Sequence, residues 1–256
     1  MRIAGPATAL TVVAALAVGC GAVGSSVVQG TAKPAPNIKP RPLTGETIRQ
    51  VLLDDAALSR MLNQPFVARK PPEFGGPDKL DQKDAAVSPA SCLGVTAMLH
   101  ESVYQSAQVK DVASESWWNN GEPAQVISVI EGVVTLPSAE QAEALFAQFS
   151  EQWQKCNGTT TTEQSGPIST TNVISDVRVA NSIVAATNTA TSVLPDMPPL
   201  EPTPQARAAG VRLNCLVEVE VVFFGDRRPS DPGSASPETS AIDIAQAMMG
   251  KISALS

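Results

Sequence analysis

The stretch 213–224 constrains the fold more than any other part of this 256-residue chain. Every second position, from Leu213 to Phe223, is apolar or cysteine, whereas the positions between them include Glu218 and Glu220. Because successive side chains of a β-strand point to opposite faces, this alternation predicts a strand with one apolar face. The apolar face needs cover from other elements, and the two glutamates are expected on the polar side of the sheet.

Two helices with apolar stripes are predicted to provide that cover. The first starts at Ser138, which has capping-box spacing to Gln141, and the second opens at Ser236-Pro237. A short helix is predicted over 54–62, strands over 109–118 and 126–136, and a hairpin over 173–189. This order predicts an α+β single domain with a largely antiparallel sheet, packed by helices on one side.

The first twenty residues predict where the chain is located. Arg2 precedes an apolar run, 7–18, which is too short to span a bilayer but is typical of a signal peptide. The following Leu16-Ala17-Val18-Gly19-Cys20 resembles the lipobox of bacterial lipoproteins. The resemblance implies cleavage after residue 19 and acylation of Cys20, with palmitate-type chains that anchor the protein to the extracytoplasmic side of the cell membrane.

The rest of the chain is expected to consist of a spacer and a folded domain. Residues 20–42 are rich in Pro, Ser and Gly and predict an extended linker, so the domain is expected over 43–256. The formal net charge of −7 argues against a nucleic-acid partner, since phosphates require a basic patch.

The cysteines indicate one disulfide. Of the four, Cys20 is assigned to lipidation, which leaves three cysteines and three possible pairings in an oxidising compartment. Cys215 lies on the apolar face of 213–224, where a free cysteine behaves as a small buried hydrophobe. We therefore predict a Cys92–Cys156 disulfide and a buried Cys215 thiol.

Motifs for catalysis are missing from the sequence. His100 is the only histidine, and in His100-Glu101-Ser102-Val103-Tyr104 a tyrosine replaces the second histidine of a zinc-protease motif. Neither a phosphate-binding loop nor a nucleophile elbow is present. The sequence thus predicts no enzyme, no catalytic residue, no cofactor and no metal site.

Two groups of residues are candidates for ligand binding. Trp117 and Trp118 are adjacent on a predicted strand and point to opposite faces, so one can meet a ligand, although core positions are favoured for both. The second group combines Glu218 and Glu220 with Asp176 and Arg178 on the polar side of the sheet, where a solvated surface is the favoured interpretation. If that side is a cleft, its ligand is polar or cationic and not a lipid.

Several segments together resemble a known family, the PknH-like extracellular domain. They are 133–142, 152–158, Pro89 to Cys92, Tyr104, 209–225 and 242–252, so the resemblance covers about residues 43–253. This domain is the external sensor module of a mycobacterial transmembrane Ser/Thr kinase and also occurs in free-standing lipoproteins. The resemblance implies a compact α+β domain with a cleft for an extracellular ligand, and a disulfide between Cys92 and Cys156. The family's second cysteine pair is missing here, and Cys215 matches neither of its positions.

The resulting hypothesis is a lipid-anchored, extracytoplasmic, sensor-like domain that binds an unknown polar ligand of the cell envelope. Two alternatives remain. The chain could be a scaffold for another envelope protein, which would show as an exposed apolar patch. Less favoured is an envelope hydrolase, which would need a pair of carboxylates close together in a cleft.

Overall fold

The computed structural model describes residues 40–82, 86–122, 124–225 and 235–256. Cys20, the predicted signal peptide and all but the last three residues of the predicted linker lie outside the described residues. Within the described ranges, no helix is long and apolar enough to cross a membrane.

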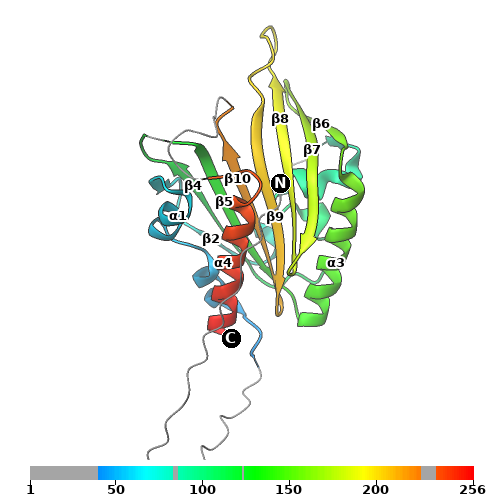
Figure 1. The fold of residues 1–256 in the computed structure, drawn as a ribbon. Coiled ribbons are helices and arrows are strands. Elements are labelled where there is room, and N and C mark those ends of the chain that lie inside the picture. The colour runs from blue at the N-terminus through cyan, green and yellow to red at the C-terminus, as the bar shows by residue number, and fades with distance from the viewer. Residues whose placement is uncertain (1–39, 83–85, 123, 226–234) are drawn as a thin grey trace, which may run out of the picture. The chain divides into compact units, whose positions relative to one another are not determined.

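Ten strands form the sheet around which the domain is built (Figure 1). They are β1 (Phe66–Ala68), β2 (Glu73–Gly75), β3 (Ala86–Ser88), β4 (Val112–Asn119), β5 (Val126–Thr135), β6 (Thr160–Ser165), β7 (Ile168–Ala180), β8 (Ile183–Val193), β9 (Thr203–Arg212) and β10 (Cys215–Phe223). Their order is β1-β4-β5-β10-β9-β8-β7-β6-β3, with β2 also paired to β4. All of these pairs are antiparallel, as the sequence predicts.

The helices are α1 (Asp55–Leu62), α2 (Leu93–Thr96), α3 (Ala139–Cys156) and α4 (Ser240–Leu255), with short 3₁₀ turns η1 (Gly45–Val51), η2 (Pro77–Lys79), η3 (Ala90–Cys92) and η4 (Glu101–Val103). The predicted cap of α3 is confirmed, because the Ser138 side chain accepts a hydrogen bond from the Gln141 N–H at 3.3 Å. The predicted short helix is α1, which Asp54 caps at its first turn.

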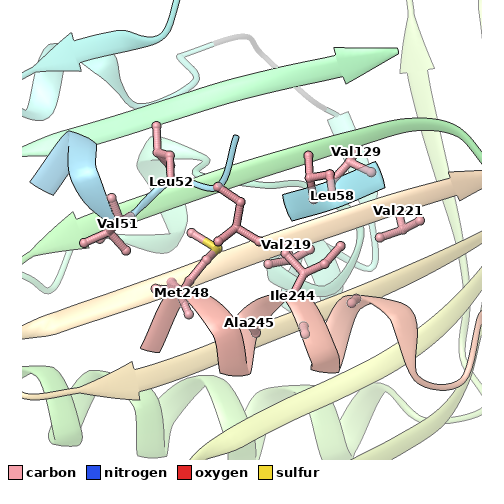
Figure 2. Close-up of a cluster of buried hydrophobic side chains, with 14 of the residues drawn as sticks. Val51, Leu52, Leu58, Val129, Val219, Val221, Ile244, Ala245 and Met248 are labelled. Atoms are coloured by element: carbon pink, nitrogen blue, oxygen red, sulfur yellow. The ribbon is translucent and has the colours of Figure 1, made fainter. Parts of the chain in front are cut away.

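Two hydrophobic cores lie on opposite faces of the sheet. The α4 core joins α4, η1 and α1 to alternate residues of β10, among them Val219 and Val221 (Figure 2). The α3 core joins α3 and the Cys92–Cys156 region to residues that point the other way, such as Leu216. The prediction of an α+β domain is confirmed, but the placement of all helices on one side is wrong. Strands β9 and β10 are apolar at intervals on both faces, so each face needs its own helix.

The long predicted strand 213–224 differs from the structure at its start. Leu213 and Asn214 form a two-residue turn, and Cys215 pairs with Arg212 of β9, a strand that the sequence analysis leaves out. The Leu213 backbone has φ of 52° without being glycine. The Asn214 side chain explains how this turn is held, because its Nδ2 donates to the carbonyl oxygens of Leu43 and Leu136 at 2.9 and 3.0 Å.

The structure confirms both cysteine predictions. Cys92 and Cys156 form a disulfide that ties η3 to the end of α3, with 5.7 Å between their Cα atoms. Cys215 is a free, fully buried thiol in the α4 core. Burial raises the pKa of this thiol to about 12, so it stays protonated and unreactive near neutral pH.

Candidate functional site

The sheet face that carries α3 is crossed by a short chain segment beside α3. We call this face the groove face. Ser116, Ile130, Glu220 and Arg207 are successive cross-strand partners on β4, β5, β10 and β9, so their side chains share this face. Residues 93–99, which begin with α2 and follow the disulfide, form the crossing segment. Its backbone carbonyl oxygens face the sheet and require hydrogen-bond donors there.

Arg207 supplies most of those donors. Its Nε donates to the carbonyl oxygen of Val95 at 3.1 Å, and its Nη2 donates to those of Gly94 and Ala97 at 3.4 and 3.1 Å. The same Nη2 forms an ion pair with Glu218 Oε2 at 3.0 Å. Arg207 is completely buried, and its charge is matched by carboxylates and carbonyl dipoles, as a buried cation requires.

Glu218 completes this buried network from the β10 side. Its Oε1 accepts hydrogen bonds from the Tyr104 hydroxyl and from the Leu99 N–H. Burial, followed by the negative charge of Glu218, raises the pKa of Tyr104 well above its usual value, so its hydroxyl remains a donor. Segment 93–99 is therefore fixed to the sheet by side chains from β9 and β10, in addition to the disulfide at its start.

Two adjoining pockets open beside segment 93–99, and both are lined by Thr96 and Glu220. We call them together the Glu220 groove. The first, about 340 Å³, is lined on the sheet by residues such as Glu163, Asn172 and Gln205. The second, about 530 Å³, lies towards β4 and includes Lys70, Ser114 and Ile130. Their size is that of sites for small molecules, and the wall of the first pocket is mainly polar.

The first pocket is strongly acidic. Glu163, Glu201 and Glu220 line it, and its lining contains no lysine or arginine among the described residues. Arg207 lies below, with its Nη1 3.7 Å from Glu220 Oε2. This buried Nη1 has no hydrogen-bond partner within the described parts of the chain. The first pocket thus carries an excess of negative charge above a single guanidinium.

The electrostatics of Glu220 follow from this position. Burial raises the pKa of Glu220, Arg207 opposes that shift, and the neighbouring charges of Glu218 and Glu163 add to it. A cation bound above Glu220 would favour its ionised form. Chemically, a positively charged group of a ligand and the Glu220 carboxylate would stabilise each other in the groove.

Comparison with known proteins identifies the family. The sequence matches the PknH-like extracellular domain over residues 43–251. The chain belongs to this family. Its fold is similar to the crystal structure of the extracellular domain of PknH from Mycobacterium tuberculosis, with a TM-score of 0.67 and 18% identity over 84% of this chain and 98% of that one.

Two further comparisons add no information about function. A putative uncharacterized protein from Mycobacterium smegmatis has 12% identity over 81% of this chain and 96% of that one, with a TM-score of 0.38. No curated protein matches the sequence. Residues 43–251 are thus a domain of the PknH-like extracellular family, which is a sensor-type family.

In this PknH-like domain, the predicted binding residues do not form one site. Glu218 and Glu220 share the groove face, but Glu218 is buried in the Arg207 network and not on a solvated surface. Arg178 pairs with Ala185, which belongs to the α4 core, so Arg178 lies on the opposite face. Asp176 is exposed in the irregular part of β7, with φ of 53°.

The two tryptophans are divided between the faces, as predicted. Trp117 is buried in the α4 core, where its Nε1 donates to Glu131 Oε1 at 3.1 Å. Trp118 lies on the groove face and is 39% exposed, with the Arg69 guanidinium carbon 4.8 Å from its ring centroid. The expectation of a core position is therefore right for Trp117 and wrong for Trp118.

The sequence analysis missed Arg207, which organises the PknH-like groove. One signal was available, because Arg207 follows the same alternation as the apolar Ala209 and Val211, which point to the groove face. A charged residue in an otherwise apolar register indicates a buried ion pair. His100 accepts from the Ser102 N–H at 3.3 Å, and the described residues contain no cluster of three or more His, Cys, Asp and Glu able to hold a metal ion.

Proposed function

We propose that this chain is a lipid-anchored, extracytoplasmic binding domain of the cell envelope whose Glu220 groove takes a polar, positively charged ligand. The observation that carries the proposal is the acidic pocket lined by Glu163, Glu201 and Glu220. Family membership supports the sensor-type role, and the polar wall of the first pocket disfavours a lipid ligand there.

The structure suggests how binding depends on pH. A ligand ammonium group beside Glu220 interacts best with the ionised carboxylate, whereas burial favours the protonated form. Affinity should therefore rise with pH through the range in which the Glu220 carboxyl loses its proton. Affinity falls again only where the ligand amine itself becomes neutral.

Spermidine, a flexible triamine, is a suitable first probe for this charge recognition. We expect the full chain to bind it in a titration calorimeter, and Glu220→Gln to weaken binding at least tenfold. Glu143→Gln is the matched control, because it removes the same charge from an exposed position on α3. Equal affinities of wild type and Glu220→Gln would contradict the proposed site.

The lipid anchor is tested separately. Cys20→Ala, expressed in an actinobacterial host, should move the chain from the membrane fraction to the soluble fraction. The intact mass should also lose the acyl chains. Because residue 20 lies ahead of the matched domain, thermal unfolding should stay unchanged. Unaltered membrane retention of the variant would contradict acylation at Cys20.

A protein-binding scaffold is the second candidate. Val173 and Val193 are 44% and 39% exposed on β7 and β8, on the face opposite the groove. Exposed apolar side chains of this kind are typical of surfaces that bind proteins. Figure 1 shows that α4 lies over β9 and β10 and leaves β7 uncovered on that face.

A hydrolase is the weaker alternative, although Glu163 and Glu220 line the same pocket. Incubation of the full chain with a chitin or chitosan tetramer, followed by mass spectrometry of the sugars, addresses it. Intact tetramers are expected from a binding domain. Release of shorter sugars by wild type but not by Glu220→Gln would overturn the binding-domain proposal.

A further inference from the structure

An exposed aromatic ledge lies on the groove face. Trp118 pairs with Val67 of β1 on one side and with Ser128 of β5 on the other, and these two flanking side chains therefore share its face. The same row continues through Val222 to Gln205, which lines the Glu220 groove. Val67 is 48% exposed and Trp118 is 39% exposed. We call this pair the Trp118 ledge.

The ledge adjoins the second pocket of the groove. Lys70, the residue after Arg69, lines that pocket, as does Ile130, whose cross-strand partner is Ser116, two residues before Trp118. The Arg69 guanidinium lies over the Trp118 ring, and a cation in this position holds an exposed ring in a fixed orientation. A fixed ring is a better platform than a mobile one, because less conformational entropy is lost when a ligand stacks on it.

The Trp118 ledge and the acidic pocket are too far apart for one small chemical group of a ligand to contact both. Glu220 lies two strands away from Trp118 across the sheet. It also lies two residues along β10 from Val222, which is in line with Trp118. These offsets correspond to roughly 12 Å between the two backbone positions. The floor between them carries the half-buried Ser116, whose hydroxyl can bind a ligand oxygen. The arrangement fits an extended, hydroxyl-rich molecule with an apolar ring face at one end and a positive charge at the other.

From this arrangement we infer that the ligand of the Glu220 groove is an oligosaccharide with free amino groups, one sugar ring of which stacks on the Trp118 ledge. The inference rests on the proposed function, because it assigns the ligand class of the same groove. A sugar hydroxyl meets Ser116, an ammonium group meets the acidic pocket, and the apolar face of a ring stacks on the indole face opposite the Arg69 guanidinium. A flexible polyamine uses only the acidic end.

Three probes separate the two ends of the groove. They are a β-1,4-linked glucosamine tetramer, its N-acetylated counterpart, and spermidine, each titrated calorimetrically into the full chain at pH 6, where the amines are charged. We expect Trp118→Ala to weaken the glucosamine tetramer at least tenfold and to leave spermidine unchanged. Glu220→Gln should weaken both, and the N-acetylated tetramer should bind wild type at least tenfold more weakly than the free amine does.

Two further variants control for folding. Trp118→Phe keeps an aromatic face and should retain most of the affinity for the glucosamine tetramer. Val193→Ala removes an exposed apolar side chain from the opposite face and should change no affinity. Circular dichroism of each variant confirms that it is folded before titration.

Failure of the inference can be told apart from failure of the proposed function. Equal binding of the glucosamine tetramer by wild type and folded Trp118→Ala would overturn the ledge, even if Glu220→Gln still abolishes spermidine binding. Equal affinities for the acetylated and free tetramers, or no binding of the free tetramer, would overturn the amino-sugar assignment. If Glu220→Gln affects neither spermidine nor the tetramer, the proposed function fails as well.

Discussion

At the scale of single residues, Glu131 should make stability depend on pH. It is completely buried in the α4 core and accepts hydrogen bonds from the Leu53 N–H at 2.9 Å and from Trp117 Nε1. Burial raises the pKa of Glu131 from 4.5 to about 8, and its cross-strand partner Glu115 adds to the shift. Between these values the unfolded chain has lost the proton that the native protein retains. The free energy of unfolding should therefore fall as pH rises, by up to about 1.4 kcal/mol per pH unit for this one group.

Urea unfolding between pH 5.5 and 8.5 measures this slope. Glu131→Gln cannot titrate, so its free energy of unfolding should vary less with pH than that of wild type, whatever the substitution costs in stability. Glu143→Gln, on the exposed side of α3, should give a curve parallel to wild type. Parallel curves for wild type and Glu131→Gln would show that Glu131 is already ionised in the native protein.

Buried ionisable residues such as Glu131 also show which features could not be predicted from the sequence. Cys215 and the apolar positions of 213–224 are predicted correctly because alternation alone determines their face. Glu131 and Arg207 are buried ionisable groups, and their burial depends on partners that come from other elements. Leu53 is 78 residues from Glu131, and Val95 is 112 residues from Arg207. No local pattern in the sequence contains such pairs.

At the scale of elements, the disulfide and the Arg207 network hold segment 93–99 independently. Cys92 and Cys156 are separated by 64 residues, and a loop of that length is stabilised by roughly 4 kcal/mol in the chain-entropy model. Replacing both cysteines by serine should lower the free energy of unfolding in urea by about that amount. Spermidine affinity should change little, because Arg207 and Glu218 still bind the segment at Ala97 and Leu99. Loss of binding in the folded double variant would show that the disulfide, not Arg207, positions the groove.

The elements that sequence patterns predict are those with an uninterrupted period. Helix α3 has an N-terminal capping residue and apolar side chains at helical spacing, and β5 and β10 have long runs of apolar residues. The existence of these three elements therefore follows from the sequence. Strand β9 is not predicted, because the turn that separates it from β10 contains neither glycine nor proline and therefore does not mark where one strand ends and the next begins. The path of segment 93–99 is not predicted either, because it depends on packing between distant residues. A Cβ atom at Gly132 would lie 2.6 Å from Leu99 Cδ1, so the segment can pack this closely on β5 only over a glycine. A glycine within a strand can indicate that another residue packs closely on it, but the sequence does not show that this residue is Leu99.

At the scale of the whole molecule, the two cores should unfold together. Leu216 belongs to the α3 core and Val217 to the α4 core, and Ala208 and Ala209 divide in the same way on β9. Each of these strands loses both of its packed faces if either core opens. We therefore expect one cooperative transition and not two, as is usual for a single domain built on one sheet.

Tryptophan fluorescence can test this coupling, because Trp117 lies in the α4 core and Trp153 in the α3 core. A protein with Trp117 and Trp118 replaced by phenylalanine retains only Trp153 as its probe. Adding Met248→Ala to it removes a fully buried side chain from the α4 core, which costs roughly 2–5 kcal/mol. The unfolding midpoint seen by Trp153 should fall by the same amount as the midpoint seen by circular dichroism. If the Trp153 midpoint stays in place while circular dichroism shifts, the cores unfold separately, and the sheet does not transmit the loss of packing from one face to the other.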